Sequence, residues 1–269
     1  MARRAEQIAD LVKTEPTEDL VMAFEGVRIV ALDIEGVDLG RNGRISLVQI
    51  AASPEACFLL DLLDKSKDND LVKWLRTILE SEDILKIIHD CRVDADALRH
   101  ILGIELRNVH DTSCWHLKLT GRSDVNLNNV LIENSIKPNV KRDNSVYSQN
   151  HAFWATRPLT PTMVEWAVGD VRSIFELHVR QIAAAHATCA MEAKILSDSY
   201  LDAARSCHIA SVTVRNTGMF IGSGGANIRA LQKSTNTLIY PRGKRGERIF
   251  TVYYTTPEGL AAVRQRAAS

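Results

Sequence analysis

Short apolar runs recur along the first half of the chain. They are rich in Val, Ile and Leu and are bounded by polar residues, which is typical of buried strands because β-branched side chains fit a sheet packed on both faces. A short glycine-containing connection separates the first two runs, so we expect these two strands to pair antiparallel. The predicted strands are residues 27–35, 45–51, 58–61, 84–89 and 109–112.

Apolar residues at helical spacing predict helices between and after these strands. The expected helices are residues 5–13, 70–79, 94–102 with Gly103 as the cap, and a helix opening at Pro161 with Thr160 as the N-cap, with helical composition continuing to Ala204. Residues 121–160 contain turn-forming clusters and a basic segment, 137–142, and predict short helices joined by loops. This order predicts a mixed α/β sheet with flanking helices.

Length and charge divide the chain in two. Its 269 residues exceed the usual size of one domain, and 45% hydrophobic with 25% charged residues is the composition of a soluble globular protein. The net charge of zero hides an asymmetry, because residues 207–269 contain nine Lys/Arg and two Asp/Glu, a balance of +7 that leaves −7 for the first 206 residues. An acidic part joined to a basic part predicts a metal-using domain and a polyanion-binding domain.

The cysteines and the N-terminus bear on the compartment. The five cysteines are odd in number and form no close pairs in the sequence, which favours reduced thiols over disulfides or a zinc site. The first 13 residues contain no apolar run long enough for a signal peptide or a membrane span. We therefore expect an intracellular protein, cytoplasmic or nuclear, that is not secreted and does not bind a membrane.

Two carboxylates end the first predicted strand. Successive strand side chains point to opposite faces, so Asp33 and Glu35 share one face while Ile34 faces the other. Two like charges beside a core repel each other and lose hydration unless a cation joins them. Hard divalent ions such as Mg²⁺ and Mn²⁺ take such oxygen ligands. The alternative is a strand that ends in solvent with both acids hydrated, so the metal site depends on further carboxylates downstream.

Motifs in the following segments add those carboxylates. They are, in order, Leu32-Asp33-Ile34-Glu35, residues 45–51, residues 86–94 from Lys86 through His89 to Asp94, Asp111-Thr112, and residues 154–160 running into 166–171. Across residues 24–180 this series resembles the DEDD superfamily of 3′-5′ exonucleases, close to the ribonuclease D type. The resemblance implies a ribonuclease H-like fold and two Mg²⁺ or Mn²⁺ ions held by four catalytic carboxylates, Asp33, Glu35, Asp94 and Asp170.

The neighbouring polar residues have competing interpretations. Asp96 is an alternative to Asp94, but the spacing from His89 in the related enzymes favours Asp94. We expect Asp111 to accept hydrogen bonds at a strand end rather than to bind a metal. His89 is expected to pack beside the site rather than to act as a catalyst.

One position departs from the family pattern. The tyrosine branch of the superfamily has a Tyr four residues before the last Asp, where its hydroxyl can position or deprotonate the attacking water. This chain has Trp166 there, and an indole has a donor but no acceptor. Glu165 is adjacent but lies about 100° away around a helix. Metal-bound water can react without a dedicated base, so the ligand set predicts activity while Trp166 favours a domain that only binds.

Residues 208–269 resemble a KH domain, a small αβ module that binds RNA or single-stranded DNA. The expected elements are strands at 211–215, 237–240 and 248–254, helices at 217–221, 226–234 and 257–267, and the GxxG loop Gly222-Ser223-Gly224-Gly225. Glycines let the backbone approach a phosphate closely, and the free N–H groups of the following helix attract anions. The basic residues expected to hold the nucleic-acid backbone are Arg229, Lys233, Arg242, Lys244 and Arg245.

These observations predict four segments: an N-terminal extension, 1–23, an exonuclease-like domain, 24–185, a helical linker, 186–207, and a KH-like domain, 208–269. The leading hypothesis is a metal-dependent 3′-5′ exonuclease whose KH module holds single-stranded RNA. The alternative is a catalytically silent RNA-binding adaptor with a protein partner. Single-stranded DNA remains open as a substrate.

Overall fold

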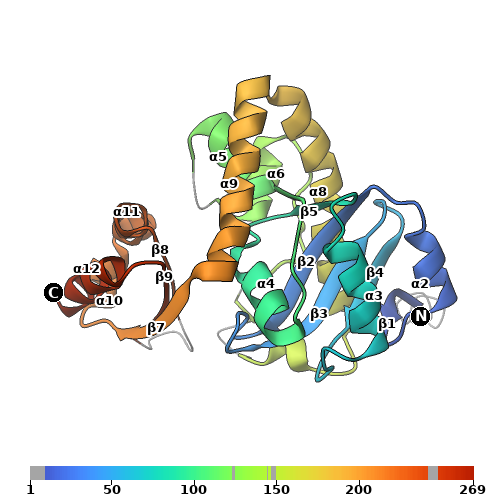
Figure 1. Cartoon of the computed structure of the whole chain (residues 1–269), viewed down its shortest axis with the longest axis horizontal. Helices are drawn as coiled ribbons and strands as arrows, with labels where there is room; N and C mark the ends of the chain where they lie inside the picture. The colour runs from blue at the N-terminus through green and yellow to red at the C-terminus, as the bar shows by residue number, and fades with distance from the viewer. Residues whose placement is uncertain (1–9, 123–124, 144, 147–149, 242–247) are drawn as a thin grey trace. The chain divides into compact units, whose positions relative to one another are not determined.

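The computed structural model describes residues 10–122, 125–143, 145–146, 150–241 and 248–269. The described residues divide into two compact units, drawn from residues 1–144 with 152–204 and from residues 145–151 with 205–269. Figure 1 shows the elements of both units. Each unit has its own sheet, one of six strands and one of three.

The first unit is built on a six-stranded sheet of order β1-β4-β3-β2-β5-β6. Strands β2, β3 and β4 are antiparallel neighbours, whereas β5 and β6 run parallel to β2, so the predicted mixed sheet and the predicted hairpin are confirmed. The strand bounds are β1 (Val12–Lys13), β2 (Ile29–Val37), β3 (Arg44–Ala51), β4 (Cys57–Asp61), β5 (Leu85–Ile88) and β6 (Val109–Asp111).

Strand β1 replaces the last two residues of the helix expected at residues 5–13, whereas Asp10 and Leu11 are helical. Val12 and Lys13 pair in parallel with Leu59 and Leu60 of β4, while residues 5–9 lie outside the described part of the chain. Two residues are too short to carry a periodic pattern. Their conformation is set by the free edge of β4 instead of by their own sequence.

Side chains alternate between the two faces of β2, so each face has its own helix. Val30, Leu32 and Ile34 join a core with Leu71 and Leu75 of helix α3 (Asp70–Leu79), which begins and ends where it was predicted. Helix α8 (Pro161–Ala184) packs against β2, β3 and β4, and its residue Asp170 meets Asp33 and Glu35. The face that carries the two acids of β2 is therefore the face covered by α8.

Other helices that the structure describes in the first unit are α2 (Glu18–Ala23), α4 (Arg92–Ala97), α5 (Thr112–Thr120), α6 (Leu127–Glu133) and α9 (Ala187–Ser206). Helix α4 continues as a π-helix, Leu98–Leu102, which ends at Gly103 in the left-handed conformation as predicted. A 3₁₀ turn, Phe153–Ala155, precedes α8, and the Thr160 hydroxyl accepts a hydrogen bond from Met163 N (3.3 Å), which confirms the predicted N-cap. Helix α9, expected as a linker, contributes Leu201 and Ala204 to the core of this unit.

The second unit has a three-stranded antiparallel sheet of order β7-β9-β8. Its elements are β7 (His208–Thr213), α10 (Thr217–Ile221), a 3₁₀ turn (Ser223–Gly225), α11 (Ala226–Thr235), β8 (Thr237–Pro241), β9 (Ile249–Tyr254) and α12 (Pro257–Ala268). Its first strand begins three residues before the predicted start, because pairing with β9 continues back to His208. In the part of the chain that the structure describes, no helix has the length and apolar character needed to cross a bilayer.

Candidate active site

Three of the four predicted carboxylates meet where β2 passes α8. Asp33 and Glu35 project from one face of β2, and Asp170 projects toward them from α8. One carboxylate oxygen of each residue lies within 4.8 Å of the other two. Glu35 is 8% exposed and Asp170 is 1% exposed, so these carboxylates are largely removed from water.

Burial and mutual repulsion disfavour ionisation of all three groups at once. Burial, and after it the charge of Asp170, raise the pKa of Asp33 to about 7. Burial and the charge of Asp33 raise the pKa of Glu35 well above its ordinary value. Burial also raises the pKa of Asp170, although the nearby Arg142 guanidinium opposes this shift. A cation among these groups would favour their ionised forms.

Asp33 provides a test of whether such a cation fits. Its Oδ2 atom is buried and has no hydrogen-bond donor within the described residues. A buried carboxylate oxygen without a donor is unfavourable, and a hard divalent ion would satisfy it. The pair Asp33 and Glu35 therefore fits Mg²⁺ or Mn²⁺, both of which prefer carboxylate oxygens.

Asp94 lies beside the three-carboxylate group but is not a member of it. Burial, followed by the charge of Asp33, raises the pKa of Asp94 well above its ordinary value, and Asp94 in turn raises the pKa of Glu35. Its competitor, Asp96, is held by Arg41 through hydrogen bonds from the backbone N (2.7 Å), Nε (2.9 Å) and Nη2 (2.6 Å). Asp96 is thus paired with Arg41, whereas Asp94 interacts electrostatically with Asp33 and Glu35.

Asp170 is held by three donors. Trp166, one turn earlier on α8, donates from Nε1 to Oδ2 (2.9 Å), and Arg142 donates from Nη1 to the same oxygen (2.8 Å). Asn139 donates from Nδ2 to Oδ1 (2.9 Å). The basic run 137–142 was the sequence signal for Arg142, whereas no pattern pointed to Asn139. The indole at position 166 is therefore directed at the carboxylate.

Packing fixes both Trp166 and Asn139 in place. Trp166 is 1% exposed and meets Trp154 edge-on, with 5.3 Å between ring centroids. Gly169 provides the space for Asn139, because a Cβ atom at this glycine would lie 2.6 Å from Asn139 Nδ2. Asn139 fills that space and also donates to Trp166 O (2.8 Å). No pattern in the sequence indicates this role of Gly169.

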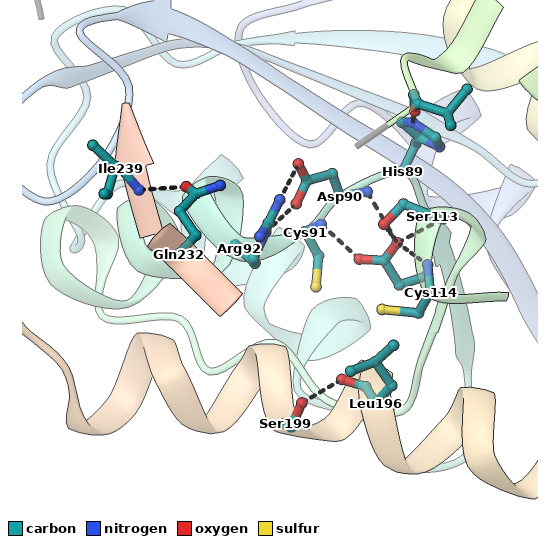
Figure 2. Close-up of polar contacts among 12 residues, drawn as sticks. His89, Asp90, Cys91, Arg92, Ser113, Cys114, Leu196, Ser199, Gln232 and Ile239 are labelled. Atoms are coloured by element: carbon teal, nitrogen blue, oxygen red, sulfur yellow. Dashed lines mark hydrogen bonds and ion pairs between the residues drawn. The ribbon is translucent and has the colours of Figure 1, made fainter. Parts of the chain in front are cut away.

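Asp111 is the strand-end acceptor that was predicted. It accepts from the backbone N atoms of Asp90 (3.0 Å) and Cys91 (2.8 Å), and from Ser113 N (2.9 Å) at the start of α5 (Figure 2). His89 contacts Thr112 Oγ1 through Nδ1 (2.8 Å) and Val125 O through Nε2 (3.1 Å). Both ring nitrogens of His89 have partners outside the acid cluster, which fits the expectation that it packs beside the site.

The GxxG loop of the second unit has the backbone that a close approach requires. Gly222, Gly224 and Gly225 have φ values of 76°, 55° and 81°, which are accessible to glycine with little strain. Arg229 of α11 donates from Nη1 to Gly224 O (2.6 Å) and so places a guanidinium at the loop. Lys233 is exposed on the same helix, and Gln232 accepts from Ile239 N (2.6 Å; Figure 2). Arg242, Lys244 and Arg245 lie outside the described residues.

The fold and the acid cluster define a nuclease-like α/β domain, followed by a KH-like unit. The family profile described as 3′-5′ exonuclease matches residues 11–180, and that of the KH domain matches residues 207–267. The chain belongs to the 3′-5′ exonuclease family and carries a C-terminal KH domain. This confirms the predicted fold class and both resemblances.

Individual relatives agree with this assignment. The chain is 26% identical over 250 residues to piRNA biogenesis protein EXD1 of Xenopus laevis, covering 88% of this chain and 53% of the relative. It is 30% identical over 145 residues to ribonuclease D of Nitrobacter hamburgensis, covering 52% of this chain and 33% of that protein. The chain thus spans about half the length of the frog relative and less of the bacterial one.

Solved structures show the same architecture. Trypanosoma brucei RNase D superposes with a TM-score of 0.59 at 26% identity, covering 73% of this chain and 74% of that one. Its complex with RNA U12 superposes with a TM-score of 0.60 at 25% identity, covering 75% and 74% of the two chains.

Proposed function

We propose that this protein is a metal-dependent 3′-5′ exonuclease that acts on single-stranded RNA held by its KH domain. The observation that carries the proposal is the convergence of Asp33, Glu35 and Asp170 within 4.8 Å in an exonuclease-family fold. The RNA preference rests on the KH domain and on relatives that include RNase D, one of them solved with RNA. A KH module holds about four nucleotides of a single strand. Because the KH domain and the acid cluster belong to one chain, RNA bound by the KH domain would have a raised effective concentration at the acid cluster.

Asp33 and Glu35 would hold Mg²⁺ or Mn²⁺, with Asp94 beside them. A divalent ion at this place would stabilise the negative charge that develops on the phosphodiester oxygens during attack by water. Side chains and backbone groups of the KH domain would bind the RNA. Gly222 to Gly225 would admit a phosphate, and Arg229 and Lys233 would neutralise the nucleic-acid backbone. The indole of Trp166 cannot take a proton from water, so no side chain at this position serves as a general base.

The test is degradation of 5′-labelled single-stranded RNA by the full chain with Mn²⁺, with Mg²⁺ and with EDTA. Asp33→Asn should abolish cleavage while RNA binding persists, because the amide cannot replace a charged ligand. Asp68→Asn removes the same charge from an exposed position and should cleave like the wild type. A parallel single-stranded DNA substrate measures the RNA preference. Equal cleavage by D33N and the wild type would refute the metal assignment.

A second candidate is an RNA-binding protein without hydrolytic activity. The observation that favours it is the engagement of Asp170 by Trp166 and Arg142, which leaves this carboxylate less able to bind a metal. Intact RNA in every lane, together with a gel shift that persists in D33N, would support this candidate over the exonuclease.

A further inference from the structure

Residues 139–142 are held against α8 by hydrogen bonds and an ion pair. Asn139 contacts Trp166 O and Asp170 Oδ1, Arg142 contacts Asp170 Oδ2, and Lys141 forms an ion pair with Glu165 (3.0 Å). Asn128 holds the backbone of Asn139 from the other direction, by accepting from its N (2.9 Å) and donating to its O (3.0 Å). These contacts fix the backbone of residues 139–142 on both sides. The position of Arg142 at the acid cluster is therefore determined by the fold.

Asp170 has few acceptor positions left for a metal ion. An ionised carboxylate offers about four acceptor positions, two on each oxygen. Trp166 and Arg142 both donate to Oδ2, and Asn139 donates to Oδ1. Among the described residues, the three hydrogen-bond partners of this carboxylate are all donors, and one of them is a cation. A divalent ion bound by Asp170 would lie next to the guanidinium, which would repel it.

The Arg142 guanidinium also supplies part of the positive charge that the carboxylates require. Asp33, Glu35 and Asp170, with Asp94 beside them, carry four negative charges when ionised. One divalent ion alone would leave two of these charges, and the guanidinium lowers that remainder to one, so less charge is left for a second divalent ion to neutralise. The Arg142 guanidinium lies 6.0 Å from the Trp166 ring centroid, so Trp166 contacts this guanidinium as well as the carboxylate.

We propose that Arg142 occupies the charge-neutralising place of a second divalent ion, so that this protein binds one ion at Asp33 and Glu35 and withholds Asp170 from metal binding. This inference rests on the proposed function in one respect, because it takes Asp33 and Glu35 as the ligands of the single ion. Removing the guanidinium frees Oδ2 of one donor and lowers the positive charge at the site. The affinity for a divalent ion, or the number bound, then rises.

The experiment is titration of the full chain with Mn²⁺ by calorimetry, with free Mn²⁺ followed by electron paramagnetic resonance. We expect one ion in the wild type, and in Arg142→Gln either a second ion or at least tenfold tighter binding. Arg180→Gln is the matched control: it makes the same substitution at an exposed residue of α8 whose partner is Glu176, and it should bind like the wild type. Two ions in the wild type, or no difference between R142Q and the wild type, would overturn the proposal.

Trp166→Phe gives a test that does not depend on the folding of R142Q. It removes the Nε1 donor to Asp170 Oδ2 but keeps an aromatic ring in the buried site, and should tighten Mn²⁺ binding several-fold. Unchanged binding in W166F would count against the proposal. Failure of RNA degradation bears on the proposed function alone, because the ion count is measured without RNA.

Discussion

Gly169→Ala offers a test of the Asn139 contact in which two opposite effects can be weighed. Replacing a glycine inside a helix by alanine ordinarily stabilises it by about 0.5–1 kcal/mol. Here the new Cβ would lie 2.6–2.9 Å from the amide atoms of Asn139, which must move away. That movement breaks the buried bonds to Trp166 O and Asp170 Oδ1, which together are worth about 2–4 kcal/mol because one acceptor is a carboxylate. We therefore expect G169A to destabilise the protein by about 1–3 kcal/mol.

The assay is urea unfolding followed by tryptophan fluorescence, because all four tryptophans lie in the first unit. The control is the same substitution in an Asn139→Ala background. There the two hydrogen bonds and the clash are already absent, so G169A should stabilise by about 0.5–1 kcal/mol and its effect should change sign. If G169A stabilised the otherwise unchanged protein, the placement of Asn139 against α8 would be refuted.

Three further predictions concern other parts of the molecule. Gln49→Leu should raise the free energy of unfolding of the metal-free protein by about 1–3 kcal/mol, measured in urea, because this fully buried amide has no hydrogen-bond partner among the described residues. A lower free energy of unfolding in Q49L would show that the amide does have a hydrogen-bond partner. The raised pKa of Asp33, about 7, means that the metal-free protein loses stability as pH rises from about 4 to 7, and that ion binding at pH 6 must first remove a proton. The increase in Tm caused by Mn²⁺ should therefore be larger at pH 8 than at pH 6, and an equal increase would contradict the assignment of Asp33 as a ligand. Arg229→Gln should weaken RNA binding and reduce the salt dependence by about one charge, whereas an unchanged salt slope would remove Arg229 from the interface.

Elements with a strong internal pattern were predictable from the sequence. The bounds of α3, 70–79, followed from apolar spacing, and the start of α8 followed from Thr160 and Pro161. Where the sequence prediction differed, the neighbouring backbone decided the conformation. Strand β1 exists because β4 has an edge to pair with, and β7 begins at His208 because β9 continues to Tyr254 opposite it. Such pairing is a property of the folded chain and leaves no periodic signal in the paired segment.

The residues of the acid cluster also divide into those that the sequence predicts and those that it does not. Two-residue alternation placed Asp33 and Glu35 on one face, and the family resemblance supplied Asp94 and Asp170. The basic run 137–142 drew attention to Arg142, but its direction and the role of Asn139 could not be predicted, because residues 134–152 carry no apolar periodicity. The approach of Asn139 depends on the missing side chain of Gly169, 30 residues further along the sequence. A glycine inside a helix is a local weakness, and only the folded structure shows what fills the space that it leaves.

Trp166 and Arg142 are best understood together. A tyrosine at position 166 could both donate and accept a hydrogen bond, whereas the indole only donates, and the guanidinium of Arg142 only donates as well. Both residues direct their donors to Asp170 Oδ2, so replacing either one leaves the other on the same oxygen. We therefore expect Trp166→Tyr alone to change Mn²⁺-dependent RNA degradation little. The double variant W166Y/R142Q should degrade RNA faster than either single variant, because it alone restores both an acceptor at position 166 and a free carboxylate oxygen. A double variant no faster than W166Y would mean that the guanidinium does not limit the site.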